Sequence, residues 1–228
     1  MGGETTVLAR RESGVLHLTL NRPQARNAMS LAMVDALQAA LAAAEADGVT
    51  RVVVLRGAGG HFCAGADLKD MAAARAQPTE DSDPLAHVNA RFGWLCAAFA
   101  RTPLAVVAVV EGTVMGGGFG LGFAEAKRLA VTGGRLDART ALTLRLVHEL
   151  VEDDAALTIA LARILGEILA CAPGAVAATK RLIGKARLAP PESLIDDAAT
   201  AFSLSAQGAE GTEGTLAFLQ KRKPSWAP

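Results

Sequence analysis

The chain has 228 residues, of which 51% are apolar and 20% charged, and its formal net charge is zero. This length suits one sizeable α/β domain with an appendage. Balanced charge without a large basic cluster argues against a nucleic-acid-binding surface, and apolar stretches shorter than about eighteen residues argue against a membrane-spanning helix.

The N-terminal residues lack the charged and apolar regions of a signal peptide. The three cysteines, Cys63, Cys96 and Cys171, are widely spaced, with neither a CxxC pair nor histidine partners. This spacing predicts reduced thiols rather than a metal site. We therefore expect a cytoplasmic protein that holds no metal.

The first part of the chain predicts two strands joined by a helix. Residues 15–20 alternate weakly and end in an Asn-Arg-Pro turn, and residues 51–55 form an apolar run closed by glycines. Between them, apolar side chains recur at helical spacing over 30–46, with Ser30 as the expected N-cap. A strand–helix–strand unit of this length implies a right-handed parallel crossover.

Residues 68–84 are polar and alanine-rich, which predicts a mobile surface loop. A helix over 87–101 and a buried strand over 104–110 are expected to follow. Beyond Gly122 the pattern is helical, so the chain divides into an α/β part, residues 1–124, and a helical part, residues 125–228. The expected helices of the second part are 139–146, 154–170, 173–188, 191–206 and 210–221.

Two glycine-rich turns follow the buried strands. One is Gly116-Gly-Gly118, after the strand over 104–110, and the other is His61-Phe-Cys-Ala-Gly-Ala-Asp-Leu68, after the strand over 51–55. Small residues leave backbone N–H groups accessible to a substrate carbonyl. Two such turns suggest a site that stabilises an oxyanion.

Five segments match the motifs of one known family, in the family's order and over nearly the whole chain. They are Leu20-Asn-Arg-Pro-Gln-Ala-Arg-Asn-Ala-Met29, His61-Phe-Cys-Ala-Gly-Ala-Asp-Leu68, Val109-Val-Glu-Gly-Thr-Val-Met-Gly-Gly-Gly118, Leu129-Ala-Val-Thr-Gly-Gly-Arg-Leu-Asp-Ala138 and Glu213-Gly-Thr-Leu-Ala-Phe-Leu-Gln-Lys-Arg-Lys223. Together they resemble the crotonase superfamily, the enoyl-CoA hydratase/isomerase family. The resemblance implies an α/β, crotonase-like spiral of ββα units with a C-terminal helical trimerisation region. It also implies an acyl-CoA thioester substrate, no separate cofactor because coenzyme A is part of the substrate, and a homotrimer or a hexamer built as a dimer of trimers.

The resemblance also assigns roles to individual residues. The backbone N–H groups of Ala66 and Gly117 would form the oxyanion hole for the thioester carbonyl. The other residues expected to bind the substrate are Arg26 and Ala28 at the nucleotide end, Ala64, Asp67 and Leu68 along the adenine and pantetheine, Gly116 and Gly120 at the glycine turn, and Phe218 and Lys221 on the last helix. In the family, the pair on the last helix often reaches the coenzyme A of a neighbouring subunit.

The sequence departs from the family's pattern in two places. Gly120 stands where many hydratases of the family carry a catalytic glutamate, so a second carboxylate would have to serve as both base and acid. Between residues 124 and 125, roughly three to four dozen residues of the pattern are absent, about one strand, one loop and one helix. That segment carries the family's second catalytic glutamate. We therefore expect the polypeptide to be longer than 228 residues, which a measurement of intact mass tests.

Four other polar residues near the turns are interpreted as structural rather than catalytic. Glu111, at the end of a strand, is expected to form a hydrogen bond, and Asp67 to cap the next helix. His61 is expected to be a solvated loop residue, and Glu125 to lie at the start of a helix.

Three functions are compatible with these residues. The first is an enoyl-CoA hydratase-like lyase, and two segments resemble those of hydratases of branched glutaconyl-CoA esters, such as methylglutaconyl-CoA and isohexenylglutaconyl-CoA. The second is a double-bond isomerase or decarboxylase of the same fold, because an oxyanion hole serves any thioester enolate. The third is a non-catalytic protein that binds CoA esters, a possibility raised by Gly120 and the absent glutamate segment.

Overall fold

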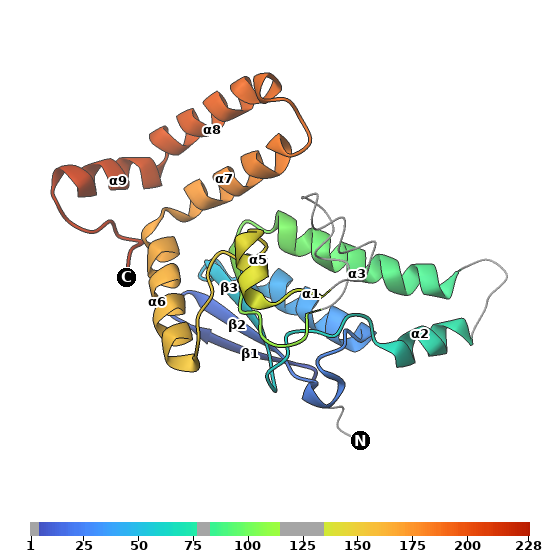
Figure 1. The fold of residues 1–228 in the computed structure, drawn as a ribbon. Helices are drawn as coiled ribbons and strands as arrows, with labels where there is room; N and C mark the ends of the chain where they lie inside the picture. The colour runs from blue at the N-terminus through green and yellow to red at the C-terminus, as the bar shows by residue number, and fades with distance from the viewer. Residues whose placement is uncertain (1–4, 77–82, 115–134) are drawn as a thin grey trace.

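The computed structural model describes residues 5–76, 83–114 and 135–228 (Figure 1). These residues form a small sheet flanked by helices, with further helices projecting from one end. The elements are β1 (Val7–Glu12), β2 (Val15–Leu20), η1 (Pro23–Ala25), α1 (Leu31–Ala46), β3 (Val52–Gly57), α2 (Leu68–Arg75), α3 (Pro84–Arg101), β4 (Ala105–Ala108), α5 (Ala138–Thr143), α6 (Asp154–Ala170), α7 (Pro173–Ala186), η3 (Pro191–Leu194), α8 (Ile195–Gln207) and α9 (Ala209–Leu219).

The sheet has the strand order β1-β2-β3-β4. Strands β2 and β3 are parallel, as are β3 and β4, so the crossover predicted through α1 is confirmed as parallel. Strand β1 pairs antiparallel with β2 and was not predicted, because only Val7 of its six residues is buried. A two-residue loop, Ser13 and Gly14, joins the pair, with positive φ angles of 49° and 77° that suit a tight hairpin.

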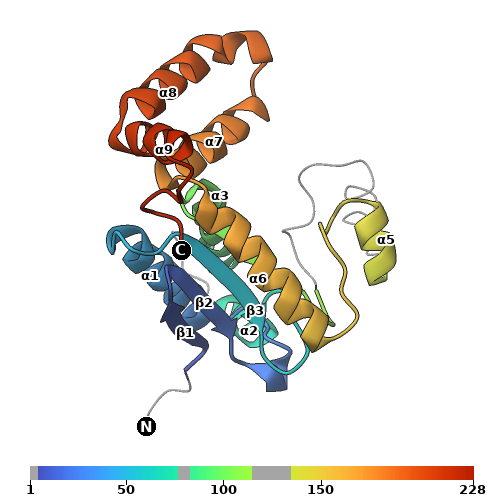
Figure 2. The same cartoon turned by 90° about the vertical axis from the view of Figure 1, so that its left-hand side faces the viewer.

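The two faces of the sheet carry separate apolar clusters. On one face, alternate residues of β2 pack against α1 and α3, with Leu16, Leu18 and Leu37 almost fully buried. On the other face, Val52 and Val54 pack against α6. Figure 2 shows α6 along one face of the sheet and α1 and α3 on the other. This alternation of side chains fixes the register of the strands, since a shift by one residue would exchange the faces.

The prediction of a loop over 68–84 is wrong for Leu68–Arg75, which form α2. The Asp67 side chain caps this helix by accepting a hydrogen bond from the Lys69 N–H at 2.8 Å. None of the residues of α2 is buried, so the sequence shows no apolar period there. The other predicted helices of the described residues are confirmed with shifts at their ends, except that the segment 191–206 divides into η3 and α8.

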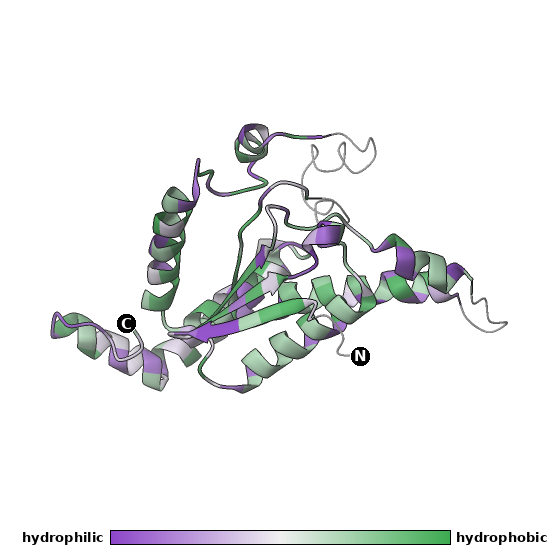
Figure 3. Ribbon diagram, turned by 90° about the horizontal axis from the view of Figure 1, so that it is seen from below, coloured by the Kyte–Doolittle hydropathy of each residue, from purple (hydrophilic) through white to green (hydrophobic). Residues whose placement is uncertain are grey.

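The helices α7, α8 and α9 form an arm that projects from the sheet (Figure 1). Large apolar side chains lie on its surface: Phe202 is 76% exposed, Phe218 82% and Leu219 72%. In Figure 3, the helix beside the C-terminus carries hydrophobic and hydrophilic residues intermixed. Among the described helices, no single one has the length and apolar character to cross a membrane; α6 and α7 pass only as a pair, and they are bent by 98°.

The carboxylate of Glu213 ties the C-terminal residues to α9. It accepts hydrogen bonds from Arg222 at 2.7 and 2.8 Å and from the Ser225 N–H at 2.7 Å. These bonds, that of Arg222 first, lower the pKa of Glu213 from 4.5 to about 2. Because the folded pKa lies below the unfolded one, this contact stabilises the fold above pH 4.5 and is lost as the pH falls toward 2.

We therefore expect the C-terminal residues to detach from α9 in acid, over the range from pH 4.5 to about 2. The fluorescence of Trp226, which lies against Gly214 of α9, reports the detachment when Trp94 is replaced by phenylalanine. In Glu213→Gln the fluorescence change over this range should shrink, because the carboxylate that titrates is gone. An unchanged acid transition in that variant would assign it to other groups.

Candidate active site

The loops that follow β3 and β4 lie side by side at the carboxyl ends of these strands. The Phe62 N–H donates to the Glu111 carbonyl at 2.8 Å, and the Cys63 N–H donates to the Thr113 carbonyl at 3.0 Å. Cys63 also forms an isolated parallel bridge with Val114. The chain that leads to the predicted glycine turn is therefore held against the turn that contains Ala66. Gly116, Gly117 and Gly120 themselves, like Glu125 and the junction at 124 and 125, lie outside the described residues.

Two glycines make this close approach of the loops possible. A Cβ atom at Gly57 would lie 1.9 Å from the His61 carbonyl oxygen. A Cβ atom at Gly112 would lie 2.1 Å from the Gly60 carbonyl oxygen, and Gly112 has a φ of +54°. Both contacts are with backbone atoms. A larger residue at Gly57 would displace the loop after β3, and one at Gly112 would force the two loops apart.

The backbone on both sides of Ala66 is paired with Met29. The Met29 N–H donates to the Gly65 carbonyl at 2.7 Å, and its carbonyl accepts from the Asp67 N–H at 3.1 Å. Since backbone groups of successive residues point in opposite directions in an extended segment, the Ala66 N–H points away from Met29. Ala66 is exposed, and among the described residues its N–H has no hydrogen-bond partner.

Asn27 connects the segment after η1 to the loop after β3. Its side chain is fully buried, and its φ is +55°, a left-handed conformation that asparagine tolerates. The side-chain oxygen accepts from the Arg22 N–H at 2.9 Å, and the side-chain nitrogen donates to the carbonyls of Ala58 and His61 at 2.9 and 2.7 Å. From the sequence, Asn27 had no predicted role beyond its place in a motif.

A buried ion pair joins the same two segments. The Arg22 Nη1 atom lies 2.6 Å from Asp67 Oδ2, and the side chains are 17% and 7% exposed. Burial alone raises the pKa of Asp67, but the hydrogen bonds from Arg22 and the Lys69 N–H outweigh it, so the pKa lies below its usual value. The prediction that Asp67 caps a helix is confirmed, whereas Arg22 was not singled out from the sequence.

Most of the predicted CoA-binding residues that the structure describes lie around this turn. The Arg26 carbonyl accepts from the Ala64 N–H at 3.0 Å, and the Ala28 carbonyl accepts from Arg22 at 2.7 Å. Leu68 follows directly and is 78% exposed. Two further predicted residues are not part of this cluster: Phe218 and Lys221 lie at the end of α9, on the projecting arm (Figure 1).

The other polar groups near the turn are already engaged. Glu111 lies 3.7 Å from Arg56, and Asp70 accepts from the Leu31 N–H at 2.6 Å. The expectation of a solvated His61 is wrong: the residue is half-buried, and its Nδ1 accepts from the Thr113 N–H at 3.1 Å. In the described part of the chain, the carboxylates of this region thus serve structural contacts. No group of three or more His, Cys, Asp or Glu side chains among the described residues could hold a metal.

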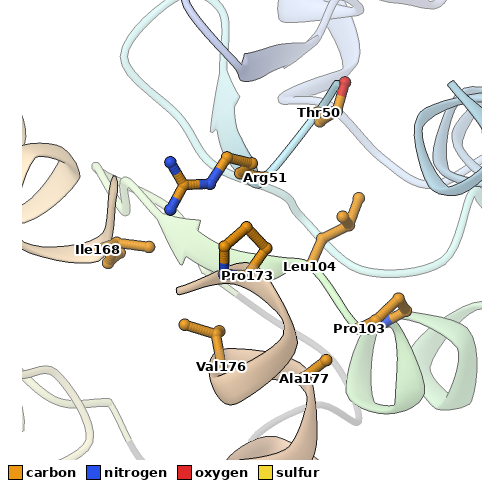
Figure 4. A pocket seen from close by; sticks show the side chains of 8 residues that line it. All are labelled: Thr50, Arg51, Pro103, Leu104, Ile168, Pro173, Val176 and Ala177. Atoms are coloured by element: carbon orange, nitrogen blue, oxygen red, sulfur yellow. The ribbon is translucent and has the colours of Figure 1, made fainter. Parts of the chain in front are cut away.

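Two hollows accompany the sheet. An open, polar hollow of about 440 Å³ lies beside the loops, lined by Thr19, Arg56, Gly57, Ala58, Gly59, Gly60, Glu111 and Asp154. A smaller apolar one, of about 100 Å³, lies at the other end of the strands (Figure 4). Arg51 borders the smaller hollow, and its guanidinium donates to the carbonyls of Trp226 and Cys171. The smaller hollow is too small for an acyl-CoA. It is lined by Thr50, Arg51, Pro103, Leu104, Ile168, Pro173, Val176 and Ala177.

The layers of this fold, with two adjoining loops at the carboxyl ends of β3 and β4, define a protein of the crotonase class. The model of the family described as enoyl-CoA hydratase/isomerase matches residues 15–133. The chain belongs to the enoyl-CoA hydratase/isomerase family, and the predicted α/β, crotonase-like fold is confirmed.

Solved structures and curated proteins are similar over nearly their whole length. The crystal structure of an enoyl-CoA hydratase/isomerase from Marinobacter aquaeolei is 37% identical, with 98% of this chain and 99% of that chain covered and a TM-score of 0.93. Pseudomonas aeruginosa AtuE is 44% identical, with coverage of 98% and 100% and a TM-score of 0.91. The 1,2-epoxyphenylacetyl-CoA isomerase of Escherichia coli (strain K12) is 28% identical, with coverage of 96% and 97%.

The last of these alignments also contains a gap in this chain. The alignment with the isomerase extends over 261 positions but contains only about 219 residues of this chain, which is 96% of 228. About 42 positions of the relative therefore have no counterpart here. The sequence pattern indicated an absence of similar size between residues 124 and 125. The number of unmatched positions agrees in size with that expected segment, whose place in the chain and catalytic glutamate stay predictions.

Proposed function

We propose that this enzyme binds an acyl-CoA thioester with the carbonyl oxygen at the Ala66 N–H and adds water across the α,β double bond. The observation that supports this most directly is the direction of that N–H, which points away from Met29 and has no partner among the described residues. Addition of water next to a thioester builds negative charge on its oxygen. One well-placed donor contributes about 3–4 kcal/mol to the transition state.

The second donor in this proposal is the Gly117 N–H, predicted from the sequence. The chain that leads to Gly117 runs beside the Ala66 turn as far as Val114, because Cys63 pairs with Thr113 and Val114. Two donors from neighbouring loops fit the two lone pairs of one carbonyl oxygen. Coenzyme A would then extend past Ala64, Asp67 and Leu68, with its nucleotide near Arg26 and Ala28.

Proton transfer in this proposal depends on a single carboxylate. Gly120 has no side chain to contribute, Asp67 and Asp70 are held by an ion pair and a hydrogen bond, and Glu111 lies 3.7 Å from Arg56. One glutamate from the segment absent between 124 and 125 would act first as base and then as acid. Because glycine has no side chain, we expect position 120 to leave room for a branched acyl group, as in a glutaconyl-CoA ester.

The test is hydration of crotonyl-CoA and of methylglutaconyl-CoA, measured as the loss of absorbance of the conjugated thioester. We expect both to be hydrated. We expect Gly120→Glu, which adds a bulky carboxylate where the proposal places the branch, to lose activity on methylglutaconyl-CoA more than on crotonyl-CoA. Migration of the double bond in a 3-enoyl-CoA without hydration would favour the isomerase. Binding of these esters without turnover would favour a non-catalytic role.

The assembly expected for this function is a homotrimer or a dimer of trimers. The arm formed by α7, α8 and α9 exposes large apolar side chains that a second subunit would cover, among them Phe202, Phe218 and Leu219. In an assembly, Phe218 and Lys221 would approach a neighbour's coenzyme A. Sedimentation at micromolar concentration should therefore give the mass of three or six subunits, and a stable monomer would contradict the proposal.

A further inference from the structure

The Arg22–Asp67 ion pair is unusual because both of its charges are largely buried. The side chains are 17% and 7% exposed, and Nη1 and Oδ2 are 2.6 Å apart. Removing two charges from water is costly, and a pair of this kind is often no more stabilising than two apolar residues of the same size. Because the pair lies next to the turn that contains Ala66, we examine a role for it other than stability.

The contacts of the pair reinforce the pairing between Met29 and the Ala66 turn. Arg22 Nη1 also donates to the Ala28 carbonyl at 2.7 Å, so one guanidinium holds the residue before Met29 and the residue after Ala66. The other oxygen of Asp67 accepts from the Lys69 N–H at 2.8 Å. Asp67 is thereby fixed by its main chain, by Arg22 and by the start of α2.

The peptide group that carries the Ala66 N–H needs such support. It joins Ala66 to Gly65, which has a φ of +92°, and glycine allows many backbone conformations. On the Gly65 side, the carbonyl of this peptide accepts from the Met29 N–H at 2.7 Å and, more weakly, from the Cys63 thiol at 3.8 Å. On the Ala66 side, the next fixed point is Asp67. The main-chain hydrogen bonds of Met29 hold this segment on both sides, and the side-chain contacts of Asp67 add a further restraint on the direction of the N–H.

We propose that Arg22 and Asp67 are positioning residues whose ion pair fixes the direction of the Ala66 N–H and thereby sets how strongly a thioester carbonyl is polarised. This inference rests on the proposed function, in which the Ala66 N–H contacts the substrate. Neither side chain needs to touch the acyl group. A displacement of about 1 Å in a catalytic group lowers rates by up to about a hundredfold, so a small rotation has a large effect.

The test uses two variants and one control. Asp67→Asn keeps a good helix cap but removes the charge that holds Arg22. Arg22→Lys keeps a positive charge but replaces the planar guanidinium, which can bond to two groups at once in a fixed geometry, by a single ammonium group. The control, Asp47→Asn, makes the same chemical change in the loop before β3, at the opposite end of that strand from the turn. Asp47 accepts from the N–H groups of Val49 and Thr50 at 2.8 and 2.7 Å and lies 3.5 Å from Arg11.

The direct measurement is the infrared band of butyryl-CoA labelled with ¹³C at the carbonyl, a saturated ester that cannot be hydrated. Bound to the unaltered protein, this band should lie at lower frequency than in water, because the N–H polarises the carbonyl. In Asp67→Asn and in Arg22→Lys it should move back toward the frequency in water, and kcat for crotonyl-CoA should fall about tenfold to a hundredfold. The dissociation constant of free coenzyme A, which lacks the carbonyl, should change little in Arg22→Lys, because Arg22 has no place among the proposed coenzyme A contacts. Asp47→Asn should change neither the band nor kcat.

A folded Asp67→Asn with the carbonyl band and kcat of the unaltered protein would overturn the inference, even if its stability were lower, since the pair would then be only structural. If Asp67→Asn does not fold, the band in Arg22→Lys decides in the same way. A failure of the proposed function is a separate result, because an unaltered protein that does not hydrate crotonyl-CoA still gives the butyryl-CoA band. An unshifted band in the unaltered protein would count against the inference itself.

Discussion

Replacement of Ala66 by proline is expected to lower kcat/KM for acyl-CoA substrates about a hundredfold to a thousandfold, the usual effect of removing one oxyanion donor. Proline has no N–H, so the change deletes the group that the proposal places at the thioester oxygen. Among the described residues this N–H has no hydrogen-bond partner, and the hydrogen bonds of Met29 go to Gly65 and Asp67. The exposed position of Ala66 leaves room for the ring.

The matched control for this variant is Ala66→Gly, which keeps the N–H and removes only a methyl group. Steady-state kinetics should place it much nearer to the unaltered protein than to Ala66→Pro. Circular dichroism and thermal unfolding must show that the proline variant is folded. A folded Ala66→Pro with full activity would remove Ala66 from the oxyanion hole.

Replacement of Asn27 by alanine is expected to lower the free energy of unfolding by about 3 kcal/mol. The change leaves the carbonyls of Ala58 and His61 and the Arg22 N–H without their partner, at roughly 1 kcal/mol each for half-buried groups. The left-handed φ of +55° adds further cost, because alanine adopts it less readily than asparagine. Urea unfolding measures the difference.

Asn21→Ala is the control for this second prediction. Asn21 is the same residue type in the same segment, but its side chain makes one exposed hydrogen bond, to the Thr5 carbonyl at 2.9 Å. Its loss should cost less than about 0.5 kcal/mol, as is usual for surface positions. Equal effects of the two substitutions would show that the contacts of Asn27 contribute nothing special to the fold.

The sequence predicted the parts of the fold that have a local signature. The helix α1 has its apolar period and its cap, Ser30, within one segment. Strand β2 alternates only weakly, but the Asn-Arg-Pro turn that follows it marks its end. Strand β1 and helix α2 were missed for a common reason: the side chains of both are almost wholly exposed, so neither carries an apolar period. The Ser13-Gly14 dipeptide was the available signal for β1, since such pairs favour tight turns.

In the candidate site, too, the sequence predicted the features that have a local signature and missed those that depend on distant residues. The turn that contains Ala66 was recognised from its small residues, which are adjacent in sequence. Asn27 and Arg22 were not, because their partners are 34 and 45 positions away, at His61 and Asp67, and only the pairing of the loops brings them together. The catalytic carboxylate stays a prediction, since Gly120 supplies none and the segment expected to supply one, between residues 124 and 125, is itself a prediction.

The hydrogen bond between Arg51 and the Trp226 carbonyl spans 175 positions of the chain. During synthesis it cannot form until residue 226 has been added, whereas β1, β2 and β3 can pair as soon as residues 7–57 have left the ribosome. We therefore expect folding in two stages, in which the sheet assembles early and the arm is fastened to it last. Since contacts of high sequence separation form slowly, the exposed apolar helices α8 and α9 would be the part of a nascent chain that depends longest on protection from aggregation.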